Sequence, residues 1–127
     1  MKETITGLLV LRAALDAIIG LGKIDLDGLC ANCTLPGRML DAMTILAKSE
    51  LKYIGGYANA FPRVPEDWLL DGGKATDGPL QLRDDLSPEV YSKIVGQWIN
   101  QGATLVGGCC GTLPSHIAAI AASLRPR

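Results

Sequence analysis

The chain has 127 residues, of which 12 are basic and 13 acidic, and 48% of its residues are hydrophobic. This composition predicts one globular unit with a modest core and excludes an intrinsically disordered chain. Charges of both signs are interspersed along the sequence, which predicts no binding of nucleic acid and no attachment to a membrane surface.

The N-terminal segment is apolar, but it has the pattern of neither a membrane span nor a signal peptide. Glu3, Arg12 and Asp16 interrupt it, and no cleavage pattern of small residues follows. No other stretch reaches the roughly 18 uncharged apolar residues that a membrane-spanning helix needs. We therefore expect a cytoplasmic protein, whose four cysteines are reduced and are candidates for metal ligands rather than for disulfides.

The first half of the chain predicts a helix, a strand, a second helix and a second strand. Strands are expected from Ile24 to Cys33 and from Tyr53 to Ala58, because both segments are short, apolar and bounded by turn residues. Helices are expected where apolar residues recur every three or four positions. These residues are Leu8, Leu11, Leu15 and Ile18 in the first helix and Met39, Leu40, Met43, Leu46 and Ala47 in the second.

The second half begins with a long loop from residue 61 to 86, where prolines, glycines and charges replace the apolar pattern. Ser87 and Pro88 then begin a helix that Gly102 ends, a third strand is expected from Ala103 to Val106, and a last helix follows Pro114. The residues expected to face inward are Tyr91, Ile94, Val95, Trp98 and Ile99 in the first of these helices and Ile117, Ile120 and Leu124 in the last.

This alternation of helices with buried strands predicts an α/β fold with parallel strands. In such a fold functional groups gather at the carboxyl ends of the strands. Cys33 ends the first strand, and Cys109 and Cys110 follow the third. Both junctions continue similarly, as Cys-Thr-Leu-Pro at 33–36 and as Cys-Gly-Thr-Leu-Pro at 110–114. Two strand ends therefore present cysteine at equivalent places.

The three cysteines at strand ends fit a catalytic zinc site, which typically has three protein ligands and one open position. Adjacent residues of a regular strand point to opposite faces, so Cys109 and Cys110 share a metal only where the strand breaks. Flanking glycines at positions 107, 108 and 111 supply the necessary backbone freedom. The alternative is that these cysteines pack as small apolar side chains.

Other reactive or aromatic residues are interpreted as structural. Cys30 lies three positions before Cys33, which on a strand places the two thiols on opposite faces, so Cys30 is expected to pack. His116, the single histidine, falls in the first turn of the last helix and is expected to be structural rather than catalytic. For Tyr57 and Trp68 packing is favoured, and lining of a substrate pocket is the alternative.

Three segments resemble one known family. Residues 102–117, with the sequence GATLVGGCCGTLPSHI, resemble the closing motif G-A-x-x-x-G-G-C-C-G-T-x-P-x-H-I of the homocysteine S-methyltransferases. Residues 31–36 resemble the family's upstream N-C-T-x-P segment, and residues 57–59 its Y-x-N segment. The segments follow one another in the family's order, and the resemblance extends from about residue 24 to residue 124.

This resemblance implies a TIM (β/α)8 barrel enzyme that transfers a methyl group from a small donor to the thiol of homocysteine, giving methionine. It implies that Cys33, Cys109 and Cys110 bind Zn2+, with the substrate sulfur completing the tetrahedron. It also implies that Asn59 binds the amino-acid end of homocysteine. No catalytic side chain beyond the metal ligands is expected.

The length of the chain departs from that family pattern, because a TIM barrel takes about 250 residues. The three expected strands would form its C-terminal half, so residues 1–127 are interpreted as a single partial homocysteine-binding domain. An open half-barrel predicts pairing with a complementary half or a second copy, or a truncated product with little activity. The alternatives are a non-catalytic zinc-binding or scaffold domain and a thiol redox protein that uses Cys30 and Cys33 or the vicinal pair.

Overall fold

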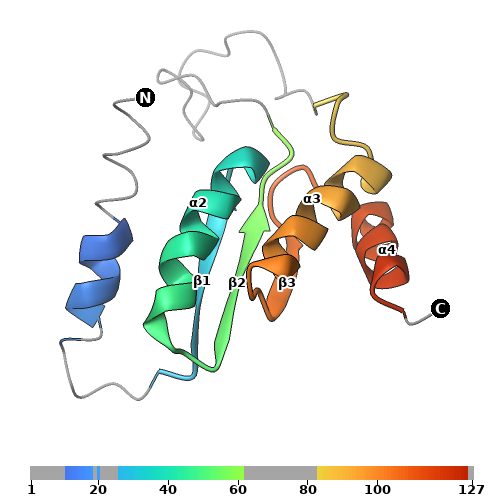
Figure 1. Ribbon diagram of the computed structural model, residues 1–127. Coiled ribbons are helices and arrows are strands. Elements are labelled where there is room, and N and C mark those ends of the chain that lie inside the picture. Colours follow the sequence, from blue (N-terminus) through green and yellow to red (C-terminus); the bar gives the residue numbers. More distant parts are fainter. Residues whose placement is uncertain (1–10, 19, 21–25, 62–82, 126–127) are drawn as a thin grey trace, which may run out of the picture.

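The computed structural model describes residues 11–18, 20, 26–61 and 83–125 (Figure 1). Within these ranges helices alternate with strands, as the sequence predicts. Residues 11–18 are helical, and the later elements are β1 (Gly28–Thr34), α2 (Pro36–Leu46), the 3-10 turn Ala47–Ser49, β2 (Tyr53–Ala58), α3 (Pro88–Asn100), β3 (Leu105–Gly108) and α4 (Pro114–Ser123).

The strands form one parallel sheet of three strands in the order β1, β2, β3. This confirms the predicted α/β class with three parallel strands, an arrangement that fits part of a (β/α)8 barrel. In the register of the sheet, Asn32 lies opposite Tyr57, and Tyr57 lies opposite Gly107. The carboxyl ends of all three strands therefore meet at one edge of the sheet.

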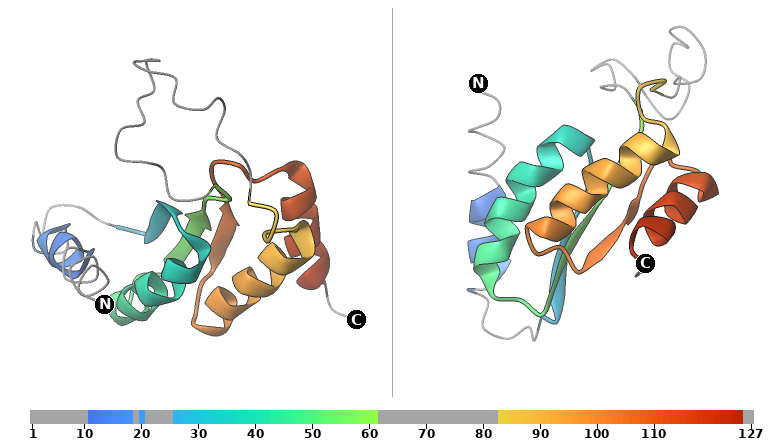
Figure 2. Two further views of the ribbon diagram at one scale, coloured as in Figure 1. Left: turned by 90° about the horizontal axis from the view of Figure 1, so that it is seen from above. Right: turned by 45° about the vertical axis from the view of Figure 1, so that its right-hand side comes forward.

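Helices α2 and α3 lie side by side over one face of the sheet, and α4 packs against α3 (Figures 1 and 2). The apolar stripes predicted for α2 and α3 are confirmed for their main residues, which are almost completely buried. Ala47 is the exception, because it is exposed and lies in the 3-10 turn that follows α2. The core contains Met39, Met43 and Leu46 from α2, Tyr91, Val95 and Trp98 from α3, and Ile54 and Ala58 from β2.

The opposite face of the sheet has no such cover in the described part of the chain (Figure 2). Side chains alternate along a strand, so Tyr53 and Tyr57 point away from the face that Ile54 contributes to the core. Tyr53 and Leu105 are 37% and 40% exposed. This open face is the one that would point into the interior of a closed barrel.

Two glycines of β2 allow its neighbours to come close. A β-carbon on Gly55 would collide with the backbone carbonyl of Leu105 on β3, and one on Gly56 would collide with the sulfur of Met39 on α2. Larger residues at these positions would therefore separate β2 from β3 or lift α2 from the sheet.

The prediction for α4 is partly wrong. Ile120 is 4% exposed as expected, but Ile117 and Leu124 are 45% and 52% exposed. His116, whose ring contacts Tyr91 on α3, and Ile120 of the core lie one turn apart on α4 and are both buried. Ile117 follows His116 by one residue, which turns its side chain by about 100° away from that contact.

The strand limits also differ from those predicted. β1 runs from Gly28 to Thr34 instead of from Ile24 to Cys33, and β3 runs from Leu105 to Gly108, two residues later than expected. β2 has the predicted limits. The shift of β3 places its end directly before Cys109, and β1 extends one residue beyond Cys33.

Some predicted features lie partly or wholly outside the described residues. Leu15 is 3% exposed, which confirms a buried face on the first helix, whereas Leu8 lies outside. Most of the predicted loop, residues 62–82 with Trp68, also lies outside. Among the described helices, none has both the length and the apolar character needed to cross a membrane.

Candidate metal centre

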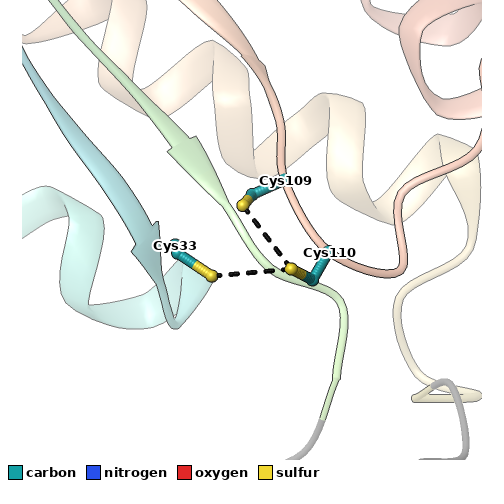
Figure 3. Close-up of side chains that lie close together, drawn as sticks. All are labelled: Cys33, Cys109 and Cys110. Atoms are coloured by element: carbon teal, nitrogen blue, oxygen red, sulfur yellow. Dashed lines mark hydrogen bonds between the residues drawn. The ribbon is translucent and has the colours of Figure 1, made fainter. Parts of the chain in front are cut away.

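The sulfur atoms of Cys33, Cys109 and Cys110 lie together at the carboxyl ends of β1 and β3 (Figure 3). The Sγ atoms of Cys33 and Cys110 are 3.8 Å apart, as are those of Cys109 and Cys110. All three atoms lie within 4.8 Å of one another. The structure thus brings together the three cysteines that the sequence singled out.

Cys33 reaches this cluster through an irregularity at the end of β1. Its backbone has a φ of 54°, in the left-handed region, and the pairing of β1 with β2 shifts between Asn32 and Thr34. A bulge of this kind redirects a side chain at the point where the regular pairing stops. The Cys33 thiol therefore leaves the face that strict alternation would have given it.

Cys109 and Cys110 lie in a turn that begins where β3 ends. The amide of Cys109 donates to the carbonyl of Ala58 at 2.9 Å, and the carbonyl of Cys110 accepts from the amide of Ala60 at 2.8 Å. Because neither cysteine belongs to the regular strand, both thiols lie on the same side (Figure 3). Backbone bonds to the end of β2 thus hold the vicinal pair in place.

The glycines around this pair have different functions. Gly111 has a φ of 75°, so it supplies the unusual backbone conformation that the sequence predicts. Gly108 instead provides space, since a β-carbon there would collide with the side chain of Thr112. Gly107 also provides space, because its β-carbon would lie 2.9 Å from the ring of Tyr57.

The electrostatics of the cluster favour charge on Cys33. A hydrogen bond from the Cys109 thiol is the main cause that lowers the pKa of Cys33. Burial, in contrast, raises the pKa of Cys109 to about 11. Of these two thiols, Cys33 therefore holds a negative charge more easily, and it is also exposed to incoming ions.

The spacing of the sulfurs fits a tetrahedral zinc ion. With Zn–S bonds of about 2.3 Å, two thiolate ligands of a tetrahedron lie about 3.8 Å apart. Cys110 has this separation from both Cys33 and Cys109. Thiolates are also ligands that zinc prefers, so the donor set fits this metal in both geometry and chemistry.

Asn59 follows β2 directly and lies beside the cysteines. Its side-chain amide donates to the carbonyl of Cys33 at 3.1 Å and lies 4.0 Å from the Cys33 sulfur. Its side-chain oxygen is buried and accepts no hydrogen bond from the residues that the structure describes. The residue predicted to bind substrate thus combines a fixed orientation with a free acceptor next to the thiols.

His116 lies outside the sulfur cluster. Its Nδ1 accepts from the amide of Leu113 at 3.0 Å, and its Nε2 lies 3.0 Å from the carbonyl of Leu86. The ring is 5% exposed. These contacts tie the first turn of α4 to the segment that precedes α3, which agrees with a structural role.

Cys30 is also outside the cluster, on the open face of the sheet. A hydrogen bond with the Cys30 thiol is the main cause that raises the pKa of Tyr57. Both residues are partly buried. Their mutual contact agrees with the packing role expected for each.

The parallel α/β fold and the three thiols at its strand ends together define a class of protein, one with a candidate thiolate metal centre. The family model for homocysteine S-methyltransferase matches residues 4–124 of this chain. The chain therefore belongs to the homocysteine S-methyltransferase family, which confirms the resemblance carried by its motifs.

Several relatives support this membership. Homocysteine S-methyltransferase 4 of Zea mays is 30% identical over 103 residues, which are 78% of this chain and 27% of that protein. Selenocysteine methyltransferase of Astragalus bisulcatus is 30% identical over 92 residues, 70% of this chain and 24% of that protein. Methionine synthase of Mycobacterium tuberculosis is 32% identical over 114 residues, 88% of this chain and 8% of that protein.

The chain spans only about a quarter of the length of these plant relatives, 27% and 24%. No solved structure gives a significant match to it.

Proposed function

We propose that Cys33, Cys109 and Cys110 bind Zn2+ and that this centre serves the transfer of a methyl group to homocysteine, giving methionine. The observation that carries the proposal is the convergence of these thiols within 4.8 Å in a member of the homocysteine S-methyltransferase family. Zinc, when bound, supplies the charge that keeps a coordinated thiol deprotonated near neutral pH.

The proposed chemistry is a direct displacement. The homocysteine sulfur attacks the methyl carbon of a small onium donor, and a sulfur–carbon bond forms. The bond between the methyl carbon and the donor heteroatom breaks, its electron pair stays with the donor, and the thiol proton passes to solvent. This reaction needs no general base, which agrees with the burial of His116 against backbone groups.

The residues beside the cysteines would orient the substrate. The buried side-chain oxygen of Asn59, which has no partner among the described residues, would accept a hydrogen bond from the ammonium group of homocysteine, and the bond from its amide to the Cys33 carbonyl fixes the orientation of the side chain. Cys33 and Cys110 are exposed, so a substrate sulfur can approach the cluster from solvent. A reducing compartment, the cytoplasm, would keep these thiols available.

We further propose that the chain acts as part of a larger barrel. In the described residues β1 and β3 are edge strands, and Ile117 on α4 and Leu124 directly after it are exposed. Further strands of a barrel would pair with the edge strands, and the closed barrel would cover the open face of the sheet. A complementary half is the partner that these features favour, and a second copy of the chain is the alternative.

Metal content, solution mass and product formation together test the proposed function. The full chain is expected to hold nearly one zinc ion and to form methionine from homocysteine with a sulfonium compound, betaine or a methylated folate. The assay is run on the chain alone and with a complementary barrel half. Bound zinc without methionine under all of these conditions would contradict catalysis and leave only metal binding.

A non-catalytic zinc-binding or scaffold domain is the second candidate, favoured by the short span of the chain relative to the plant relatives, 27% and 24% of their length. A stable monomer that binds Co2+ in place of zinc, with an absorption spectrum that homocysteine does not change, would support it. Retention of zinc under mild oxidation would count against a thiol redox function.

Replacing Asn59 with alanine is expected to weaken homocysteine binding. A hydrogen bond to a charged group contributes about 1.5–3 kcal/mol, so the affinity should fall roughly 10- to 100-fold. The measurement is the homocysteine concentration that half-changes the Co2+ spectrum of the site. Asn100→Ala, at the exposed end of α3, is the matched control. Equal affinity in both variants would remove Asn59 from the binding site.

A further inference from the structure

The side chain of Tyr91 joins the ends of two strands behind the sulfur cluster. Tyr91 lies in the first turn of α3 and is completely buried. Its hydroxyl lies 3.0 Å from the carbonyl oxygen of Ala58 and 2.9 Å from that of Gly107. Both oxygens are acceptors, so the one hydroxyl hydrogen is shared between a carbonyl at the end of β2 and a carbonyl near the end of β3.

Both carbonyls belong to the segments that carry the candidate site. Ala58 immediately precedes Asn59, and Gly107 lies two residues before Cys109. The Ala58 carbonyl also accepts from the amide of Cys109 at 2.9 Å. A change in the separation of Ala58 and Gly107 would therefore move Asn59 relative to the vicinal cysteines.

The ring of Tyr91 is held from two sides. It makes edge contacts with Trp98, at a centroid distance of 6.0 Å, and with His116, at 5.6 Å. Burial raises the pKa of Tyr91 to about 12, so its hydroxyl remains a donor at neutral and mildly alkaline pH. The position and protonation of this hydroxyl are thus fixed by the core.

We propose that Tyr91 is a positioning residue of the metal centre, whose hydroxyl holds the ends of β2 and β3 at the separation that brings Asn59, Cys109 and Cys110 beside Cys33. The identity of the bound ion as zinc rests on the function proposed above. The strand contact itself is independent of that function. Outer groups that orient metal ligands commonly change metal affinity 10- to 100-fold when they are removed.

The test is Tyr91→Phe in the full chain, because phenylalanine keeps the ring contacts with Trp98 and His116 and removes only the hydroxyl. Tyr53→Phe is the matched control, since Tyr53 lies at the amino end of β2 and is 37% exposed. Zn2+ affinity is measured by competition with a chromophoric chelator, and the Co2+ absorption spectrum reports the geometry of the thiolates. We expect affinity to fall about tenfold in Tyr91→Phe and to stay unchanged in Tyr53→Phe.

Amide hydrogen exchange of the metal-free chain provides a second measurement that does not depend on zinc. In Tyr91→Phe the amides of Cys109 and Ala60, which bond across the carboxyl ends of the strands, should exchange faster. The amide of Thr104, which bonds to Ile54 at the opposite end of β3, should not. A uniform increase at all three amides would indicate general destabilisation and would overturn the proposal.

The possible results separate the two proposals. Zn2+ affinity within twofold of the unmodified chain, with an unchanged Co2+ spectrum, would overturn the positioning role of Tyr91. If the unmodified chain binds neither Zn2+ nor Co2+, the proposed function fails. The local exchange at Cys109 and Ala60 then decides alone whether the Tyr91 hydroxyl positions the strand ends.

Discussion

Replacing Cys110 with serine is expected to abolish stable zinc binding. Cys110 is the central sulfur of the cluster, 3.8 Å from the sulfurs of both Cys33 and Cys109. Loss of an outer orienting group already weakens metal sites 10- to 100-fold, so loss of a direct thiolate should exceed about 100-fold. The zinc content after dialysis against a chelator should fall from nearly one ion per chain to a trace.

Cys30→Ser is the matched control for this experiment. It makes the same chemical change on β1, three residues before Cys33, but its sulfur is outside the metal-competent group. Serine can also keep a hydrogen bond with Tyr57. Zinc retained in Cys110→Ser, or lost equally from Cys30→Ser, would contradict the assignment of the ligands.

The second large effect is expected from Gly55→Ala. The added β-carbon would collide with the backbone carbonyl of Leu105, which cannot turn aside as a flexible side chain would. Overpacking typically costs about 1–3 kcal/mol, and a collision with backbone belongs at the upper end of that range. Urea denaturation followed by circular dichroism should show this loss in the free energy of unfolding. Zinc affinity should also fall, because β2 and β3 would separate.

Gly96→Ala provides an opposite control. Gly96 lies inside α3, and a β-carbon there would meet nothing within 4 Å. Because alanine is a better helix former than glycine, this variant should be more stable by about 1 kcal/mol. If both variants changed stability in the same direction, the close approach of β2 and β3 would not be what requires glycine at position 55.

The sequence was sufficient to predict the elements whose patterns are strong. Buried stripes on α2 and α3 and the apolar run of β2 follow from periodicity, since each has one clear inner face. The convergence of Cys33 with the vicinal pair follows from the parallel order of the strands. Parallel strands place their carboxyl ends together, so residues distant in the chain become neighbours.

Other features depend on tertiary contacts that periodicity does not contain. On α4, Ile117 and Ile120 both satisfy helical spacing, but the contact of His116 with Leu86 turns inward the side that carries Ile120. Leu124 lies beyond the last residue of α4 and is exposed there. Tyr91 was predicted only as a buried apolar residue. Its hydroxyl bonds to Ala58 and Gly107 arise from the way α3 crosses the strand ends, for which no local pattern gives a signal.

The left-handed backbone conformation at position 33 favours glycine, whereas the sulfur cluster requires cysteine there. A residue with a β-carbon in this region costs about 1–3 kcal/mol, whereas glycine adopts it freely. Glycine at position 33 would therefore relax the chain locally while it removed the sulfur. The backbone at the end of β1 is thus locally frustrated. Such frustration is expected where a residue is selected for binding rather than for folding stability.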